Sequence, residues 1–203
     1  MMSKKQLYIP DVMIKAGRYA QLFGELKQNT RQQVLIKMEG LIRKEQVFCD
    51  QGNYGHLCNI FSAIALYEIL QKQGKSKEEA YKIISEAMWK ELEKTKKLYQ
   101  KITKIPGSFS AFKKLLPSMF AKASGRGWKH EWFPNKHNEL YFEVKECIYA
   151  HLFKKYGVPE LGPMFCHSDE INFGELHNIQ FIRKGTLCNG DEKCDFLFVR
   201  GKN

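Results

Sequence analysis

This sequence has no long hydrophobic run and no segment that resembles an export signal. The longest apolar-rich stretch, residues 60–70, is interrupted by Ser62 and Glu68 and is much shorter than the roughly 20 residues that span a bilayer. The first ten residues carry positive charge but contain no apolar core of signal-peptide length. We therefore expect a cytoplasmic protein that does not cross a membrane.

The six cysteines lack the spacings of a disulfide scaffold or of a local zinc site. Zinc knuckles and thioredoxin-type redox centres place two residues between their cysteines, whereas the closest pair here, Cys188 and Cys194, leaves five. We predict reduced thiols, no local metal site and no bound cofactor. A metal site assembled from distant residues stays open, because zinc accepts Cys, His and Asp ligands.

Acidic residues are missing from one segment of an otherwise mixed-charge chain. Residues 101–130 contain seven of the 33 Lys and Arg residues and none of the 22 Asp and Glu residues. Such a concentration favours a small anionic substrate near one face, and a solvated lysine-rich surface is the alternative. No nucleic-acid-binding motif is present, so we do not expect nucleic acid as a partner. Nothing in the sequence specifies an oligomeric state.

Internal repeats and linkers are absent as well, so 203 residues with 43% hydrophobic content predict a single domain over residues 1–203. Apolar residues at helical spacing over 34–42 predict an amphipathic helix. The segment 54–73 is apolar on nearly every side and predicts a central, buried helix. Ser76 followed by Glu79 forms a capping box that predicts the start of a third helix.

A basic segment follows between two groups of helix breakers. It carries an apolar stripe of Phe109, Phe112, Leu116 and Phe120, and Pro117 is expected to kink or divide the helix. We predict that this helix covers the core with its aromatic face, and binding to a membrane surface is the alternative.

Aromatic and β-branched residues become frequent after Trp128. Residues 178–188 and 193–200 alternate well enough to be strands, and the turn formers at 189–191 predict a hairpin between them. Helices followed by strands indicate an α+β fold. We expect an N-terminal helical bundle, about residues 1–125, packed on a small C-terminal antiparallel sheet within a mixed part, about residues 126–203.

Three short motifs contain most of the reactive residue types. Cys147 stands ten residues before a Gly-x-Pro-Glu-Leu turn at 157–161, followed by Phe-Cys-x-x-Asp at 165–169 and Gly-Asp-x-x-Cys-Asp-Phe-x-Phe at 190–198. Together they resemble the L-2-amino-thiazoline-4-carboxylic acid hydrolase family over roughly residues 140–200. The terminal motif is also similar to that of vinyl-reductase-type ligand domains.

The first resemblance implies a hydrolase that cleaves a carbon–nitrogen or carbon–sulfur bond of a small cyclic amidine. A substrate such as L-2-amino-thiazoline-4-carboxylate would then open to a carbamoyl-cysteine. The second resemblance implies the alternative, a non-catalytic domain that binds a small ligand. Ring opening needs attack on the carbon between nitrogen and sulfur, a proton for the departing atom and a cation for the carboxylate.

The C-terminal third offers a residue for each task. Cys166 is the candidate nucleophile, with its thiolate stabilised by His167 or by a nearby cation. Asp169, three residues later on a helical turn, is the candidate base or orienting residue. Arg183, with its planar fork of donors, is the candidate carboxylate clamp. Further expected site residues are Cys194 and Asp195 in the catalytic set, and Cys147, His56 and His167 as substrate contacts.

Each of these residues also has a structural interpretation. Cysteines often pack as small buried hydrophobes, and a carboxylate at Asp195 inside a strand must find hydrogen-bond donors. For His56 the sequence favours a core or capping histidine over a residue that lines the pocket, and Arg183 also fits a solvated strand residue. If the residues act together, those at 166, 169, 183, 194 and 195 should converge on one pocket.

Overall fold

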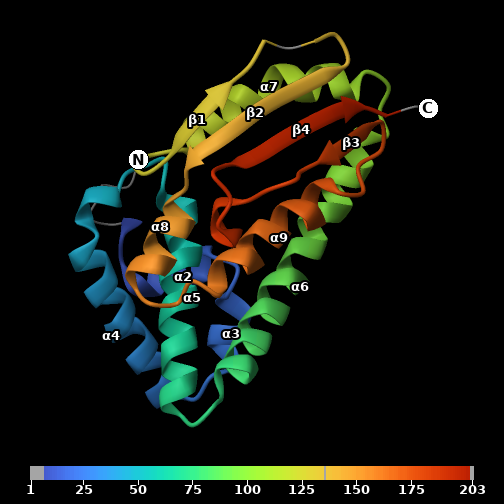
Figure 1. Cartoon of the computed structure of the whole chain (residues 1–203). Helices are drawn as coiled ribbons and strands as arrows, with labels where there is room; N and C mark the ends of the chain where they lie inside the picture. Colours follow the sequence, from blue (N-terminus) through green and yellow to red (C-terminus); the bar gives the residue numbers. More distant parts are fainter. Residues whose placement is uncertain (1–6, 135, 202–203) are drawn as a thin grey trace.

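Helices form one large part of the molecule in this computed structural model, which describes residues 7–134 and 136–201. The helices, labelled as in Figure 1, are α2 (Pro10–Ala16), α3 (Ala20–Glu25), α4 (Gln28–Lys44), the short 3-10 helix η1 (Gln46–Phe48), α5 (Tyr54–Lys72), α6 (Lys77–Thr103), α8 (Ile148–Lys155) and α9 (Leu161–Phe173). Their apolar side chains form one continuous core. No helix in the described part of the chain has the length and apolar character needed to cross a bilayer.

Helix α5 lies at the centre of this core, as the sequence predicts. Twelve of its 19 residues are buried, on all sides of the helix. The buried hydroxyl of Ser62 donates a 2.6 Å hydrogen bond to the carbonyl oxygen of Cys58, and that of Tyr67 donates one of 2.8 Å to Glu160 Oε1, so both remain satisfied. The following helix, α6, begins at the predicted capping box. Ser76 accepts a hydrogen bond from the Glu79 N–H, and Glu79 accepts one from the Ser76 N–H.

A four-stranded antiparallel sheet lies at one end of the helices, with α7 (Ser108–Ala123) behind it in Figure 1. Its strands are β1 (Lys129–Trp132), β2 (Glu139–Glu146), β3 (Ile179–Ile182) and β4 (Cys194–Arg200), in the spatial order β1-β2-β4-β3. The predicted aromatic stripe of α7 packs on the inner face of this sheet, with Phe120 4.9 Å from Phe142 and Phe112 4.8 Å from Phe198 between ring centroids. The α+β class with a C-terminal antiparallel sheet is confirmed.

Of the two outcomes expected at Pro117, a kink or a division, the structure excludes the division, because α7 runs from Ser108 to Ala123 in one piece. A proline inside a helix removes one backbone hydrogen bond and costs about 3 kcal/mol. Phe112 and Leu116 before it and Phe120 after it pack against the same sheet, and this shared burial outweighs that cost.

Strands β3 and β4 pair with each other as predicted, but the connection between them is longer than a tight hairpin turn. The strand expected over residues 178–188 ends at Ile182, and residues 183–193, here called the carboxylate loop, contain the 3-10 helix η2 (Leu187–Asn189). Two carboxylates hold this loop. Asp195 accepts hydrogen bonds from the N–H groups of Lys184 (3.0 Å) and Gly185 (2.8 Å), and Asp191 accepts one from Thr186 (2.7 Å). These hydrogen bonds to carboxylate side chains replace the backbone hydrogen bonds that a longer β3 would have formed with β4.

Candidate active site

A cavity of about 570 Å³ lies where the N-terminal end of α5, the end of α7, α9 and the sheet meet. Four cysteines line it: Cys147 at the start of α8, Cys166 on α9, Cys188 on η2 and Cys194 at the start of β4. All four are free thiols. Among residues 7–134 and 136–201, no three His, Cys, Asp or Glu side chains are arranged to hold a metal ion.

Gly162 allows Cys188 to lie beside Cys166. Gly162 precedes Cys166 by four residues on α9, so both occupy the same helix face. A Cβ atom on Gly162 would lie only 2.8 Å from both Cβ and Sγ of Cys188. The missing side chain therefore lets η2 pack directly on α9 and brings the two thiols together.

We expect Gly162→Ala to displace Cys188 and slow alkylation of Cys166 at neutral pH. The added methyl group overlaps side-chain atoms that belong to a short helix fixed by its loop, at a cost of about 1–3 kcal/mol in stability. Iodoacetamide labelling followed by peptide mass spectrometry measures the first effect, and thermal unfolding measures the second. Gly40→Ala is the matched control, since a Cβ atom there meets nothing within 4 Å and alanine favours a helix. Unchanged labelling in Gly162→Ala would contradict the role of this packing.

The thiol of Cys166 differs electrostatically from those around it. A hydrogen bond from Cys188 lowers the pKa of Cys166, and the Thr186 hydroxyl and the Arg183 charge act in the same direction, against the opposing effects of burial and of the Asp169 charge. Hydrogen bonds with Cys147 and Cys166 raise the pKa of Cys188, and burial raises that of Cys194 to about 12. Cys166 is therefore the thiol among these three that ionises most readily.

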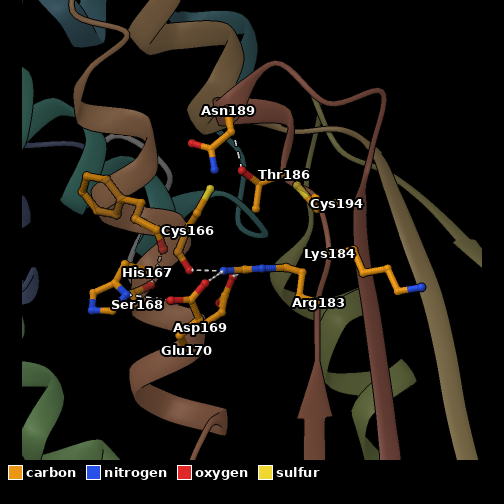
Figure 2. A network of polar contacts seen from close by, with 12 residues as sticks. Cys166, His167, Ser168, Asp169, Glu170, Arg183, Lys184, Thr186, Asn189 and Cys194 are labelled. Atoms are coloured by element: carbon orange, nitrogen blue, oxygen red, sulfur yellow. Dashed lines mark hydrogen bonds and ion pairs between the residues drawn. The ribbon is translucent and has the colours of Figure 1, made fainter.

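The carboxylate loop aims the hydroxyl of Thr186 at Cys166 (Figure 2). Thr186 is buried, with 5% of its surface exposed, and its oxygen accepts a 3.3 Å hydrogen bond from the Asn189 N–H. One lone pair of the oxygen accepts this bond, and the hydroxyl proton remains available to the Cys166 sulfur, whose pKa it lowers. The loop thus supplies both Cys188 and Thr186 as donors to Cys166.

We expect Thr186→Val to raise the pKa of the Cys166 thiol and to slow its alkylation at pH 7 by about tenfold. Valine keeps the shape of threonine but has no hydroxyl to stabilise the thiolate. Thr186→Ser retains the hydroxyl and is the control that should label at close to the wild-type rate. The measurement is the alkylation rate of Cys166 as a function of pH, and identical profiles for wild type and Thr186→Val would refute this contact.

Asp169 lies one helical turn after Cys166 and lines the same cavity. Burial raises its pKa to about 6, although the positive charge of Arg183 opposes this shift. Its side chain is still 32% exposed, and it is one of the groups that form the cavity wall. A carboxyl group with a pKa near 6 can both accept and donate a proton close to neutral pH.

Arg183 is not available as the substrate clamp that the sequence predicts. Its guanidinium is 4% exposed, and it donates to Asp169 Oδ2 (2.8 Å), to the Cys166 carbonyl oxygen (2.8 Å) and to Glu170 Oε1 (2.9 Å). It is not part of the cavity wall. Figure 2 shows that it instead joins the carboxylate loop to α9 and so holds both Cys166 and Asp169 in place.

Two other expected site residues point elsewhere. His167 contacts Glu170 through Nδ1 at 2.8 Å and packs edge-on against Trp89, on the side of α9 away from the carboxylate loop (Figure 2). Successive helical residues are about 100° apart, so His167 does not reach the Cys166 thiol. Asp195 does not line the cavity either, because neighbouring strand residues face opposite sides and Cys194 takes the inner one.

His56 lines the cavity, as expected, and its two nitrogens are both occupied. Nε2 lies 2.8 Å from the Ala123 carbonyl oxygen and Nδ1 lies 3.0 Å from the Tyr149 hydroxyl. Since a carbonyl oxygen only accepts, Nε2 carries the proton and Nδ1 accepts from Tyr149. Burial lowers the pKa of His56 to about 4, so the ring is neutral at pH 7 and joins α5 to α7 and α8.

Three residues of this region were not among the expected site residues: Cys188, Thr186 and Arg18. Thr186 and Cys188 lie within four residues before the Gly-Asp motif, and this position is the sequence feature that could have identified them. Arg18 lies in the connection between α2 and α3, far from every motif, and reaches the cavity through tertiary packing. No local pattern in the sequence identifies it.

Comparison with known proteins identifies a family. No curated protein and no solved structure matches the chain. The family model described as L-2-amino-thiazoline-4-carboxylic acid hydrolase matches residues 57–198, which include Asp169 and all four cysteines of the cavity. The match is longer than the region of roughly 140–200 that carries the sequence motifs, and it extends into α5 and α6. The chain therefore belongs to the L-2-amino-thiazoline-4-carboxylic acid hydrolase family.

Proposed function

We propose that this protein is a thiol-dependent hydrolase that opens a small cyclic amidine such as L-2-amino-thiazoline-4-carboxylate to a carbamoyl-cysteine. One observation carries the proposal. Cys166, whose pKa is lowered by Cys188 and Thr186, lines the same cavity as Asp169, whose pKa is raised to about 6. A stabilised thiolate next to a carboxyl group that exchanges protons near neutral pH is the pair that nucleophilic ring opening requires.

In the proposed reaction, the sulfur of Cys166 attacks the ring carbon between nitrogen and sulfur, and Asp169 takes up the thiol proton. The bond from that carbon to one ring heteroatom then breaks, and Asp169 returns the proton to the departing atom. The opened substrate is now joined to Cys166 through its amidine carbon. Water attacks this carbon, Asp169 accepts one proton from the water, and the other water proton passes to the amidine nitrogen as the new carbon–oxygen double bond forms. The bond to Cys166 breaks, its sulfur leaves as a thiolate, and Asp169 returns its proton to that thiolate. One water molecule is consumed, and Cys166 and Asp169 return to their starting states.

The remaining thiols have supporting roles in this proposal. Cys188 donates to the Cys166 thiolate while the nucleophile is free. Cys194, whose pKa is raised to about 12, stays protonated, and its sulfur accepts a hydrogen bond from the Leu187 N–H at 3.2 Å. Cys147 lies against Cys188 and closes the same wall. We propose that these two thiols form the surface on which the ring sulfur packs.

The test is turnover by the purified protein in water labelled with oxygen-18. We expect L-2-amino-thiazoline-4-carboxylate to yield carbamoyl-cysteine that carries one heavy oxygen, and rapid quenching to trap an adduct on Cys166, both measured by mass spectrometry. The substrate should also raise the unfolding temperature. Stabilisation by thiazoline or hydantoin carboxylates without any product would favour the non-catalytic ligand-binding alternative. The absence of both turnover and stabilisation would refute the proposed substrate class.

A further inference from the structure

Arg18 brings a positive charge to the cavity, and no carboxylate of the described residues forms a direct ion pair with it. Among residues 7–134 and 136–201, no hydrogen bond or ion pair involves the Arg18 guanidinium. The Arg183 guanidinium, in contrast, donates hydrogen bonds to Asp169, Glu170 and a backbone carbonyl oxygen. The charge of Arg18 acts on His56, Tyr149 and Asp169, which all line the same cavity. Because the guanidinium lines the cavity and has no direct partner, it is available to bind an anionic ligand there.

The backbone at Arg18 is fixed against α5. Its N–H donates a 2.9 Å hydrogen bond to Asn59 Oδ1, and the Asn59 side-chain amide donates in turn to the Gly55 carbonyl oxygen at 3.0 Å. At the preceding residue, Gly17, a Cβ atom would lie 3.2 Å from the Cys58 carbonyl oxygen. The connection between α2 and α3 therefore lies close to α5, and the backbone of Arg18 is held in a fixed position at the cavity wall.

The charges of the cavity favour an anion. Asp169 is the acidic lining residue, and Arg183 already pairs with it. Arg18 and Lys122 are the cationic lining residues, and Lys122 is exposed near the end of α7. An arginine presents two parallel N–H donors that match the two oxygens of a carboxylate, and the geometry is maintained because the group is planar.

We propose that Arg18 binds the carboxylate of the substrate and that the site therefore selects small ring compounds bearing one. The inference rests on the proposed function for the identity of the ring, but carboxylate binding is a separate property. Arg18 lies before residue 57, where the family match begins, so the match does not assign this residue a role.

The test uses L-thiazolidine-4-carboxylate, a saturated ring that has no amidine carbon to attack, and thiazolidine, which lacks the carboxylate. Calorimetry should show that Arg18→Ala weakens binding of the carboxylate by about thirtyfold, with Arg18→Lys intermediate, while binding of thiazolidine stays unchanged. Lys122→Ala, the matched loss of one positive charge, should change binding by less than about twofold in 0.15 M salt, because an exposed charge is screened. If Arg18→Ala unfolds, Arg18→Gln provides a second variant, because glutamine removes the charge and keeps more of the side chain than alanine does.

Equal binding of the carboxylate by wild type and Arg18→Ala, or equal weakening in Arg18→Ala and Lys122→Ala, would overturn the assignment. Failure of the wild type to bind the carboxylate would also overturn it. Because the saturated ring is not hydrolysed, these outcomes are independent of turnover. Binding that depends on Arg18 in a protein that never opens the amidine ring would refute the hydrolase proposal alone.

Discussion

Replacement of Cys166 by serine is expected to lower kcat for L-2-amino-thiazoline-4-carboxylate by at least about 1,000-fold without unfolding the protein. A serine hydroxyl is almost un-ionised at neutral pH, so the contacts from Cys188 and Thr186 that favour a thiolate have no anion to stabilise. The two side chains have nearly the same size, and therefore the packing of α9 against η2 should persist. The measurement is single-turnover product formation, with circular dichroism to confirm the fold.

Cys58→Ala is the control for loss of a cysteine as such. Cys58 lies on α5 with 1% of its surface exposed, and it is not part of the cavity wall. Its replacement should cost about 1 kcal/mol of stability and leave kcat unchanged. If Cys166→Ser retains more than a tenth of the wild-type kcat, the nucleophile is not this thiol, and direct attack by water becomes the leading mechanism.

The second large effect is expected for Asp169→Asn, which should lower kcat/KM by a factor of about 100 to 10,000. The amide can still accept the hydrogen bond from Arg183, so the local structure should persist while the side chain can no longer accept a proton. In the wild type, kcat/KM should rise as the pH increases through about 6, where Asp169 becomes a carboxylate able to accept the thiol proton. This limb of the pH profile should disappear in Asp169→Asn.

A matched carboxylate provides the control for that change. Glu170 also pairs with Arg183, at 2.9 Å, but its side chain is 54% exposed and does not line the cavity. Glu170→Gln should therefore leave kcat/KM within about threefold of wild type. A pH limb near 6 that survives in Asp169→Asn would show that another group controls the profile.

The same pKa shift has a consequence for stability. The folded-state pKa of about 6 exceeds the ordinary value of 3.8, so the folded protein holds this proton more tightly than the unfolded chain does. Ionisation of Asp169 therefore reduces the free energy of unfolding as the pH rises from about 4 to about 6. Thermal unfolding of Asp169→Asn over this range should lack that contribution.

The sequence predicts the elements whose signals are local. The all-round apolar character of α5 and the capping box at Ser76 are properties of neighbouring residues, and the structure confirms both. The carboxylate loop was not predicted, because alternation of side chains after Ile182 resembles a strand. The competing hydrogen bonds come from Asp191 and Asp195, and their geometry is set only after the chain has turned.

For the site, residue type identified candidates but not their directions. Cys166 and Asp169, one helical turn apart, line one cavity as their spacing predicts. Strand alternation already implied that Asp195 faces away from Cys194, and this signal outweighs the shared motif. The residue type of Arg183 predicts a carboxylate clamp, but its guanidinium donates to Asp169, Glu170 and the Cys166 carbonyl oxygen on α9 instead. The position of Arg18 at the cavity depends on contacts between α5 and a connection about 40 residues earlier, which no local pattern encodes.

The hydrogen bonds that fix the path of the carboxylate loop are donated by its main-chain N–H groups and not by particular side chains along it. Asp191 and Asp195 hold main-chain N–H groups, which every residue except proline possesses, so they constrain the path of the loop without specifying the side chains along it. Such a loop is compatible with different residues at cavity positions such as Arg18. We therefore expect proteins that share the Gly-Asp-x-x-Cys-Asp motif to include lineages with different substrates, distinguished by their N-terminal helices.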